Sequence, residues 1–214
     1  FKNLMKAFFS KIKYIRHNFR LFNKPLKTKN KKIILVEFNQ LASSIISYSY
    51  LSNALKDKHN ANIIAYRLTT KRNLFKDIIW ILLSKIFFIL NFLVYSSFGV
   101  TGFWFPGFLY KKNKNIKNII KKIKNKNDLL NLEVDEIDIG DLIYDSYLMD
   151  YKEATVDIKS QNFLKYFEHT LSTFFEWKNI FKNYDVKGVI TSHSIYNLAI
   201  PLRLAVSKNI DAFQ

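Results

Sequence analysis

A polar corner late in the chain carries residue types that could do acid–base chemistry. Ser192, His193 and Ser194 follow a short apolar run at 188–191, which is typical of a buried strand, and a helix is expected over about 195–206. A strand that passes directly into a helix indicates an α/β sheet, in which ligands bind beyond the carboxyl ends of the strands. Because the ordinary pKa of histidine lies near neutrality, His193 could exchange a proton there.

A second polar corner follows the first apolar run of the chain. Residues 33–37, Ile-Ile-Leu-Val-Glu, are bounded by lysines and a polar turn, which is the pattern of a buried parallel strand. Glu37 ends this strand and Asn39 lies in the turn, and a helix over 41–56 and a strand over 62–66 are expected next. Polar groups thus gather at the ends of two separate strands.

A third group of polar residues lies in the stretch 135–151, DEIDIGDLIYDSYLMDY. Asp141 and Asp145 are four residues apart and would share one face of a helix. Paired carboxylates can act as a general acid and base or hold a metal ion. At this spacing they also occur on solvated faces, and Asp141 could be the N-cap of the helix. Both interpretations stay open.

The elements that would position these residues alternate between strands and helices. They predict an α/β fold, with a Rossmann-like parallel sheet flanked by helices. A long helix is expected over about 160–183, and the start of one more strand over 210–214. The run 98–110 holds glycines, a proline and clustered aromatics and is expected to be a loop, and 111–127 to be an exposed helix.

Several binding motifs are absent from the sequence. No GxGxxG follows a strand and no GxxxxGK[ST] occurs, which excludes the dinucleotide fingerprint and the P-loop. There is no cysteine, and the 4 histidines form no HxxxH or HExxH pair. The sequence therefore predicts neither a cofactor nor a metal site.

The net charge of +17 raises the question of a polyanionic partner. Most of the positive charge is lysine, it is concentrated in blocks, and the acidic stretch 128–157 argues against nucleic acid. An anionic membrane surface is the alternative, since a basic side chain near it contributes roughly 1 kcal/mol.

Two stretches bear on the membrane. Residues 1–23 place apolar side chains at helical spacing between lysines and arginines, which indicates either a membrane-surface helix or an ordinary packed helix. The apolar stretch 71–97 includes Lys85 and Asn91, so its insertion free energy is roughly zero. It is expected to lie on the membrane or in the core rather than to span.

The chain begins at Phe1 and ends at Gln214 within an apolar run, and it is interpreted as a fragment of a longer protein. Residues 1–30 are predicted to be a basic amphipathic helix with a polar linker. Residues 31–214 are predicted to form a Rossmann-like domain, cut before a second domain.

Four stretches together resemble a known family: ILVEFNQLASSIISYSYLSNAL, VYSSFGV, IGDLIYDSYLMDYKEATVD and GVITSHSIYNLAIPLRLAV. They are similar to the N-terminal half of bacterial surface-polysaccharide (capsule or O-antigen) biosynthesis proteins of the GT-B glycosyltransferase type. The resemblance implies two Rossmann-like domains that face a cleft, of which this chain would be the acceptor-side domain. It also implies a nucleotide-sugar donor bound mainly by the other domain, no metal, and a carbohydrate or lipid-linked acceptor at the cytoplasmic membrane face.

The resemblance also suggests roles for individual residues. His193 is the first candidate for the base that deprotonates the acceptor hydroxyl, Glu37 the second, and Asp141 and Asp145 the third. The predicted substrate-binding residues are Asn39 and Tyr196 on sugar hydroxyls, Ser192 in the corner, Arg203 on a phosphate or as a brace for its helix, and the two aspartates.

Two alternatives remain open at the level of the sequence. His193 could instead cap the helix that leaves its corner or satisfy a neighbouring loop. The whole chain could be a non-catalytic α/β binding module held at a membrane surface by its first helix.

Overall fold

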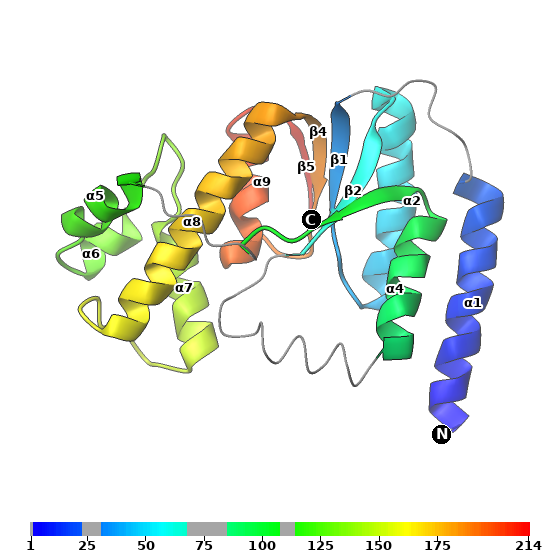
Figure 1. The fold of residues 1–214 in the computed structure, drawn as a ribbon, viewed down its shortest axis with the longest axis horizontal. Helices are drawn as coiled ribbons and strands as arrows, with labels where there is room; N and C mark the ends of the chain where they lie inside the picture. The colour runs from blue at the N-terminus through cyan, green and yellow to red at the C-terminus, as the bar shows by residue number, and fades with distance from the viewer. Residues whose placement is uncertain (1, 23–30, 68–84, 108–113) are drawn as a thin grey trace.

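The computed structural model describes residues 2–22, 31–67, 85–107 and 114–214, and it has an α/β fold built on one parallel sheet (Figure 1). The strand order is β3-β2-β1-β4-β5, and every neighbouring pair is parallel. The strands are β1 (Lys32–Glu37), β2 (Asn62–Tyr66), β3 (Val100–Trp104), β4 (Asp185–Ile190) and β5 (Asp211–Phe213). The predicted Rossmann-like α/β class is confirmed.

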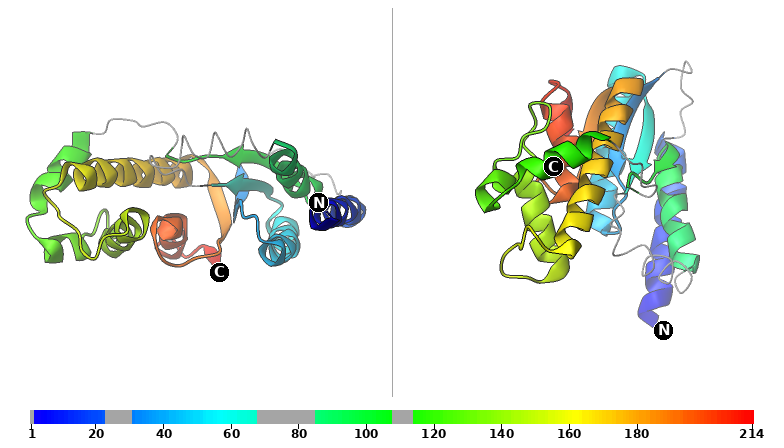
Figure 2. Two further views of the ribbon diagram at one scale, coloured as in Figure 1. Left: turned by 90° about the horizontal axis from the view of Figure 1, so that it is seen from below. Right: turned by 60° about the vertical axis from the view of Figure 1, so that its left-hand side comes forward.

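Helices cover both faces of the sheet. Figure 2 shows α1 (Lys2–Phe22), α2 (Ala42–His59) and α4 (Lys85–Ser97) on one side, and α7 (Gly140–Tyr151), α8 (Gln161–Asn183) and α9 (Ile200–Val206) on the other. Two short helices, α5 (Lys114–Lys122) and α6 (Lys126–Leu130), lie at the outer end of α7 and α8, and a 3-10 turn, η1 (Asn197–Ala199), precedes α9.

Strand β1 supplies both cores through the alternation of its side chains. Ile33 and Leu35 belong to the cluster that includes Trp177 of α8, whereas Ile34 and Val36 belong to the cluster under α2 and α4. All four are at most 2% exposed, as expected for a central parallel strand that is buried on both faces.

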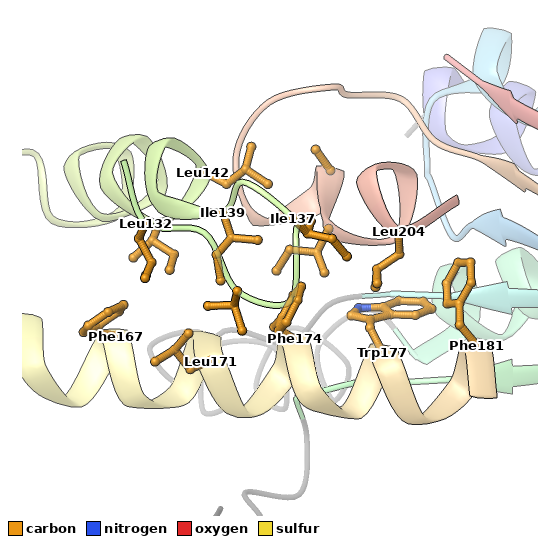
Figure 3. Close-up of a cluster of buried hydrophobic side chains, with 14 of the residues drawn as sticks. Leu132, Ile137, Ile139, Leu142, Phe167, Leu171, Phe174, Trp177, Phe181 and Leu204 are labelled. Carbon is orange, nitrogen blue, oxygen red and sulfur yellow. The ribbon is translucent and has the colours of Figure 1, made fainter. Parts of the chain in front are cut away.

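Helix α8 contributes many of the buried side chains of the larger core. Ser160 caps it by accepting a hydrogen bond from the amide of Phe163, at 3.2 Å between Oγ and N. Figure 3 shows its inward side chains facing the segment before α7 and Leu204 of α9. The labelled side chains of α8 are Phe167, Leu171, Phe174, Trp177 and Phe181.

Gly140 begins α7 at a point of close backbone approach. A Cβ atom added there would lie 1.9 Å from the carbonyl oxygen of Leu129 and 2.8 Å from the amide nitrogen of Leu132. Only glycine fits this position, which explains the Ile-Gly-Asp sequence at the start of the helix.

Several predictions about elements were wrong. The predicted loop at 98–110 contains strand β3, and the predicted helix at 111–127 is divided into α5 and α6. The N-cap position of α7 is Ile139, so the suggestion that Asp141 caps this helix fails. The helix expected over 195–206 begins only at Ile200, after η1.

The N-terminal helix packs against the domain. Lys11 Nζ donates to Asn91 Oδ1 of α4 at 2.7 Å, and Tyr14 Oη is hydrogen-bonded to Ser49 Oγ of α2 at 2.6 Å. None of the helices within the described residues is long and apolar enough to cross a bilayer. The first part of the predicted apolar stretch 71–97, up to residue 84, and most of the predicted linker lie outside the described residues.

Candidate functional site

The strand order places the topological switch point of the sheet between β1 and β4, and the region at the carboxyl ends of these two strands is called the β1–β4 crevice. The chain leaves the carboxyl end of β1 through α2 on one face of the sheet, and it leaves that of β4 through η1 and α9 on the opposite face. Connections that diverge in this way open a crevice at the carboxyl ends of the two strands, which is where open α/β sheets bind ligands. Val36 is paired with Ile190, so Glu37 and Thr191 are the next residues on each strand.

Glu37 receives hydrogen bonds from the other side of this crevice. Its carboxylate accepts from Thr191 Oγ1 at 2.9 Å, from the Ser192 amide at 2.5 Å, and from Ser192 Oγ at 2.8 and 2.9 Å. The residue is only 8% exposed, and these donors offset the cost of burying its charge. All of them are neutral, so the negative charge itself is not cancelled by them.

Ser192 links this carboxylate to His193. Ser192 Oγ lies 2.6 Å from His193 Nδ1. The hydroxyl group has one hydrogen, and a carboxylate can only accept, so the hydroxyl donates to Glu37 and accepts from a protonated Nδ1. This arrangement, the Glu37–Ser192–His193 relay, leaves the lone pair on Nε2 of an exposed imidazole ring. An acceptor hydroxyl group could lose its proton to that nitrogen.

The suggestion that His193 caps a helix is wrong. The residue at the N-cap position of α9 is Ala199, and the residue before η1 is Tyr196. The ring of His193 instead makes its hydrogen bond with Ser192 of the same corner, and the alternative that it satisfies a neighbouring loop stays open.

Asn39 is held at the same edge by Tyr95 of α4. The Tyr95 hydroxyl accepts from the Asn39 amide at 2.7 Å and donates to the Glu37 carbonyl oxygen at 2.9 Å. The side-chain oxygen of Asn39 accepts from the Leu41 amide at 2.9 Å, which orders the turn before α2. The side chain of Asn39 is thus engaged through its oxygen, and its amide nitrogen is the group that could donate to a ligand.

Two further tyrosines surround Glu37. Burial and the nearby Glu37 carboxylate raise the pKa of Tyr48 to about 12, although Ser192 and Ser44 act in the opposite direction. Burial, and then Glu37, raise the pKa of Tyr66 well above its ordinary value. Both phenols stay protonated at neutral pH. Within the described residues neither hydroxyl group makes a hydrogen bond of ordinary geometry, although Ser192, Ser44 and Asn39 lie near that of Tyr48 and Thr191 lies near that of Tyr66. Both phenols can act as hydrogen-bond donors but not as bases.

Asp141 and Arg203 lie together at a different place, between α7 and α9. Arg203 Nη1 and Nη2 donate to the two carboxylate oxygens of Asp141 at 2.7 and 2.5 Å, and Nη1 also donates to the Asp138 carbonyl oxygen at 2.5 Å. Partial burial opposes ionisation of Asp141, but hydrogen bonds from Arg203 and its charge outweigh it and lower the pKa. This two-pronged ion pair, the Asp141–Arg203 fork, holds α7 and α9 together. Arg203 was predicted either to bind a phosphate or to brace its helix, and the structure shows the brace.

Asp145 lies one turn after Asp141 and is exposed on α7. No three His, Asp or Glu side chains in the described part of the chain are grouped so that they could hold a metal ion. Of the two aspartates predicted to act as a pair, Asp141 therefore forms an ion pair with Arg203, whereas Asp145 lies on a solvated face.

Tyr196 lies in the turn that joins the crevice corner to η1. Its φ of 61° and ψ of −179° fall in a region that is almost confined to glycine. The following residue anchors the turn: the Asn197 amide donates to Ser146 Oγ at 2.7 Å, and its side chain donates to Tyr166 Oη at 2.8 Å. The strained turn is thus fixed to α7 and α8, which holds the adjacent corner in place.

Sequence reasoning did not identify Tyr48, Tyr95 or Thr191 as part of this site. Thr191 directly precedes the predicted corner, and its position at the end of a strand was the available signal. The tyrosines reach the site from helices, and nothing in their local sequence indicates that.

A cavity of about 170 Å³ lies elsewhere, between the end of α1 and the second half of α2. Leu21, Phe22, Tyr50, Asn53, Ala54, Lys56 and Asp57 line it. These residues of α2 lie toward the amino-terminal edge of the sheet. The crevice corner remains the better candidate because its polar groups converge at a topological switch point.

No family model, curated protein or solved structure matches this chain. The function is therefore argued from the site alone.

Proposed function

We propose that this chain is the acceptor-side half of a glycosyltransferase, which transfers a sugar from a nucleotide-sugar donor to a surface-polysaccharide or lipid-linked acceptor. The observation that carries the proposal is the Glu37–Ser192–His193 relay across the β1–β4 crevice, which engages Nδ1 of an exposed imidazole ring at the edge of the sheet where such folds bind ligands. The resemblance of the sequence to GT-B proteins suggests the reaction class.

The reaction requires one proton transfer on the acceptor side. The acceptor hydroxyl oxygen forms a bond to the anomeric carbon of the donor, the bond from that carbon to the phosphate oxygen breaks, and the nucleoside diphosphate leaves with the electron pair. Nε2 of His193 takes the hydroxyl proton. The imidazolium ion that results is stabilised by the charge of Glu37, transmitted through the Ser192 hydroxyl group.

Hydrogen-bond donors around the crevice would orient the acceptor. The amide nitrogen of Asn39 and the buried hydroxyl groups of Tyr48 and Tyr66 belong to the same edge of the sheet. Protonated phenols can donate to sugar oxygens, and buried polar groups without a partner favour a ligand that supplies one. Glu37 is thus a positioning residue rather than the base itself.

The proposal includes a location at the cytoplasmic face of the membrane, as a peripheral protein. Helix α1 supports it, since this basic helix keeps Phe9 and Phe19 exposed. A lipid-linked acceptor would be presented at that surface.

The test is sugar transfer by the full-length gene product, because the proposed donor-binding domain is a separate unit. Wild type is compared with His193→Ala for transfer onto lipid extracted from cells, and a loss of about 10²- to 10⁴-fold is expected. His59→Ala is the matched control: this histidine lies 3.6 Å from Asp211 at the opposite edge of the sheet, and its replacement should leave transfer unchanged. Equal transfer by His193→Ala and wild type would remove His193 from catalysis, whereas no transfer by wild type would leave the binding-module alternative.

A further inference from the structure

The outer sides of α1 and α4 carry two apolar stripes that adjoin. On α1, Phe8, Ile12 and Phe19 recur at intervals of four and seven residues, and successive residues of a helix are turned by about 100°, so the three share one flank. On α4, Ile89 and Leu93 are 57% and 48% exposed and face away from the sheet.

The contacts of α1 fix the direction of its stripe. Tyr14 contacts α2 through Ser49, whereas Lys11 and Asn18 contact α4 through Asn91 and Ser97. Around the helix, the stripe lies beyond the residues that contact α4, on the side away from α2. It therefore continues the exposed face of α4, and both helices lie side by side at the outside of the domain (Figures 1 and 2).

Basic side chains border this apolar surface. Lys13, Arg16 and Arg20 are exposed on the outer face of α1, next to the stripe. Residues 1–32 contain no acidic side chain that would neutralise them. An apolar strip with a cationic border is the pattern of a helix that lies in the interface of an anionic bilayer.

We infer that the α1–α4 face, formed by Phe8, Ile12, Phe19, Ile89 and Leu93 with the border Lys13, Arg16 and Arg20, docks on an anionic lipid surface. The inference rests on the membrane location in the proposed function and names the surface that provides it. A second copy of the chain is a poorer occupant, because it would bring two identical cationic borders together between molecules of formal charge +17.

The docking also places the candidate site. The N-terminal ends of α1 and α4 lie at the same end of the molecule as the carboxyl ends of β1 and β4 (Figure 1). A chain docked through both helices therefore holds the crevice edge close to the lipid, where a lipid-linked acceptor is available.

The experiment is co-sedimentation of the full chain with phosphatidylcholine vesicles that do or do not contain phosphatidylglycerol. Wild type is expected to bind the mixed vesicles and not the neutral ones. The double variant Ile89→Asp/Leu93→Asp should bind more than about tenfold more weakly, because two charges would enter the interface. The matched control, Met149→Asp/Val206→Asp, changes two equally exposed apolar residues of α7 and α9 and should bind as wild type does.

A second variant keeps the test decisive if the double aspartate variant loses its circular dichroism spectrum. Lys13→Gln/Arg16→Gln/Arg20→Gln removes only exposed charges, and it should weaken binding by more than about tenfold at low salt. Equal binding of wild type and either variant set would overturn the inference. So would a wild-type dimer in sedimentation that Ile89→Asp/Leu93→Asp dissociates, since the face would then be a protein interface.

Vesicle binding involves no sugar transfer, so His193→Ala should bind vesicles as wild type does. A full-length protein that binds vesicles but transfers no sugar would contradict the proposed function alone, whereas a full-length protein that transfers sugar without binding vesicles would contradict the docking alone.

Discussion

The crevice between β1 and β4 and the junction between α7 and α9 each hold a carboxylate bonded by a distant part of the chain, but the two are used differently. Asp141 meets a guanidinium group that cancels its charge with a two-pronged contact. The hydrogen bonds to the Glu37 carboxylate come from neutral donors. One of these donors, the Ser192 hydroxyl group, is also hydrogen-bonded to the exposed imidazole ring of His193. The same type of side chain is thus a brace where its charge is neutralised, and in the proposed function it is a positioning group where its charge is not neutralised.

Burial sharpens this difference. The Glu37 residue is 8% exposed, whereas the Asp141 side chain is 46% exposed. An exposed ion pair contributes about 0–1 kcal/mol to stability. A buried carboxylate that loses its donors costs more, so the crevice has the stricter requirement for its exact hydrogen bonds.

The largest effect on stability is expected at the start of α7. Gly140→Ala would place a methyl group 1.9 Å from the Leu129 carbonyl oxygen, and the backbone must move to relieve it. We expect a loss of at least about 3 kcal/mol in the free energy of unfolding, measured by urea denaturation. Gly102→Ala is the control, since its Cβ would meet only the terminal carbon of Ile64, at 3.1 Å. A small effect of Gly140→Ala would mean that the start of α7 is not tightly packed against Leu129 at the end of α6.

The two carboxylates are compared directly by amide substitution. Glu37→Gln puts an amide NH₂ group against donors from Thr191 and Ser192, and a loss of about 1–3 kcal/mol is expected. Asp141→Asn breaks an exposed pair, and a loss of no more than about 1 kcal/mol is expected. Urea denaturation of both variants at pH 7 gives the difference. If Asp141→Asn lost as much free energy of unfolding as Glu37→Gln, or more, the distinction between the two regions would be removed.

Most of the fold could be predicted from the sequence, because continuous apolar runs identify buried strands. Strand β3 was missed because Gly99 and Gly102 resemble turn signals; Gly102 instead lies within the strand, where the Ile64 side chain of the neighbouring strand approaches it closely. That contact joins residues far apart in the chain, and no local pattern reports it.

The candidate site could be predicted in part. The corner at Ser192 and His193 and the end of β1 at Glu37 were identified, because polar residues directly after apolar runs indicate the carboxyl ends of strands. The hydrogen bonds between them depend on β1 and β4 being neighbours, which the sheet order decides. Tyr48 and Tyr95 enter from helices on the other side of the crevice, so only tertiary packing reveals them.

The pH dependence of stability distinguishes the braced carboxylate. The pKa of Asp141 is lowered from its ordinary value of 3.8, so the ion pair with Arg203 stabilises the folded protein above that value. This contribution is lost as the pH falls through the lowered pKa. The difference in unfolding free energy between wild type and Asp141→Asn should therefore be constant near neutrality and shrink below about pH 4. A difference that does not shrink as the pH is lowered would contradict a stabilising role of this ion pair.

The smallest effect on stability is expected at Tyr48. Its hydroxyl group is buried without a partner within the described part of the chain, so Tyr48→Phe should change the unfolding free energy by less than about 1 kcal/mol. Transfer by the full-length protein should nevertheless weaken, with a higher KM for the acceptor, if this phenol donates to the sugar. Its pKa of about 12 also predicts that the stability difference between wild type and Tyr48→Phe is unchanged up to pH 10 and shifts above it, as wild type loses the contribution of the buried neutral phenol. An unchanged KM would assign Tyr48 to packing alone.

The most direct test of the account is the tautomer of His193, measured by nitrogen-15 NMR of the imidazole ring at a pH where it is neutral. The Glu37–Ser192–His193 relay predicts a protonated Nδ1 and an unprotonated Nε2, and Ser192→Ala should abolish this preference. A wild-type ring protonated at Nε2 would contradict the central claim, because Nε2 would then already carry a proton and could not accept that of an acceptor hydroxyl group.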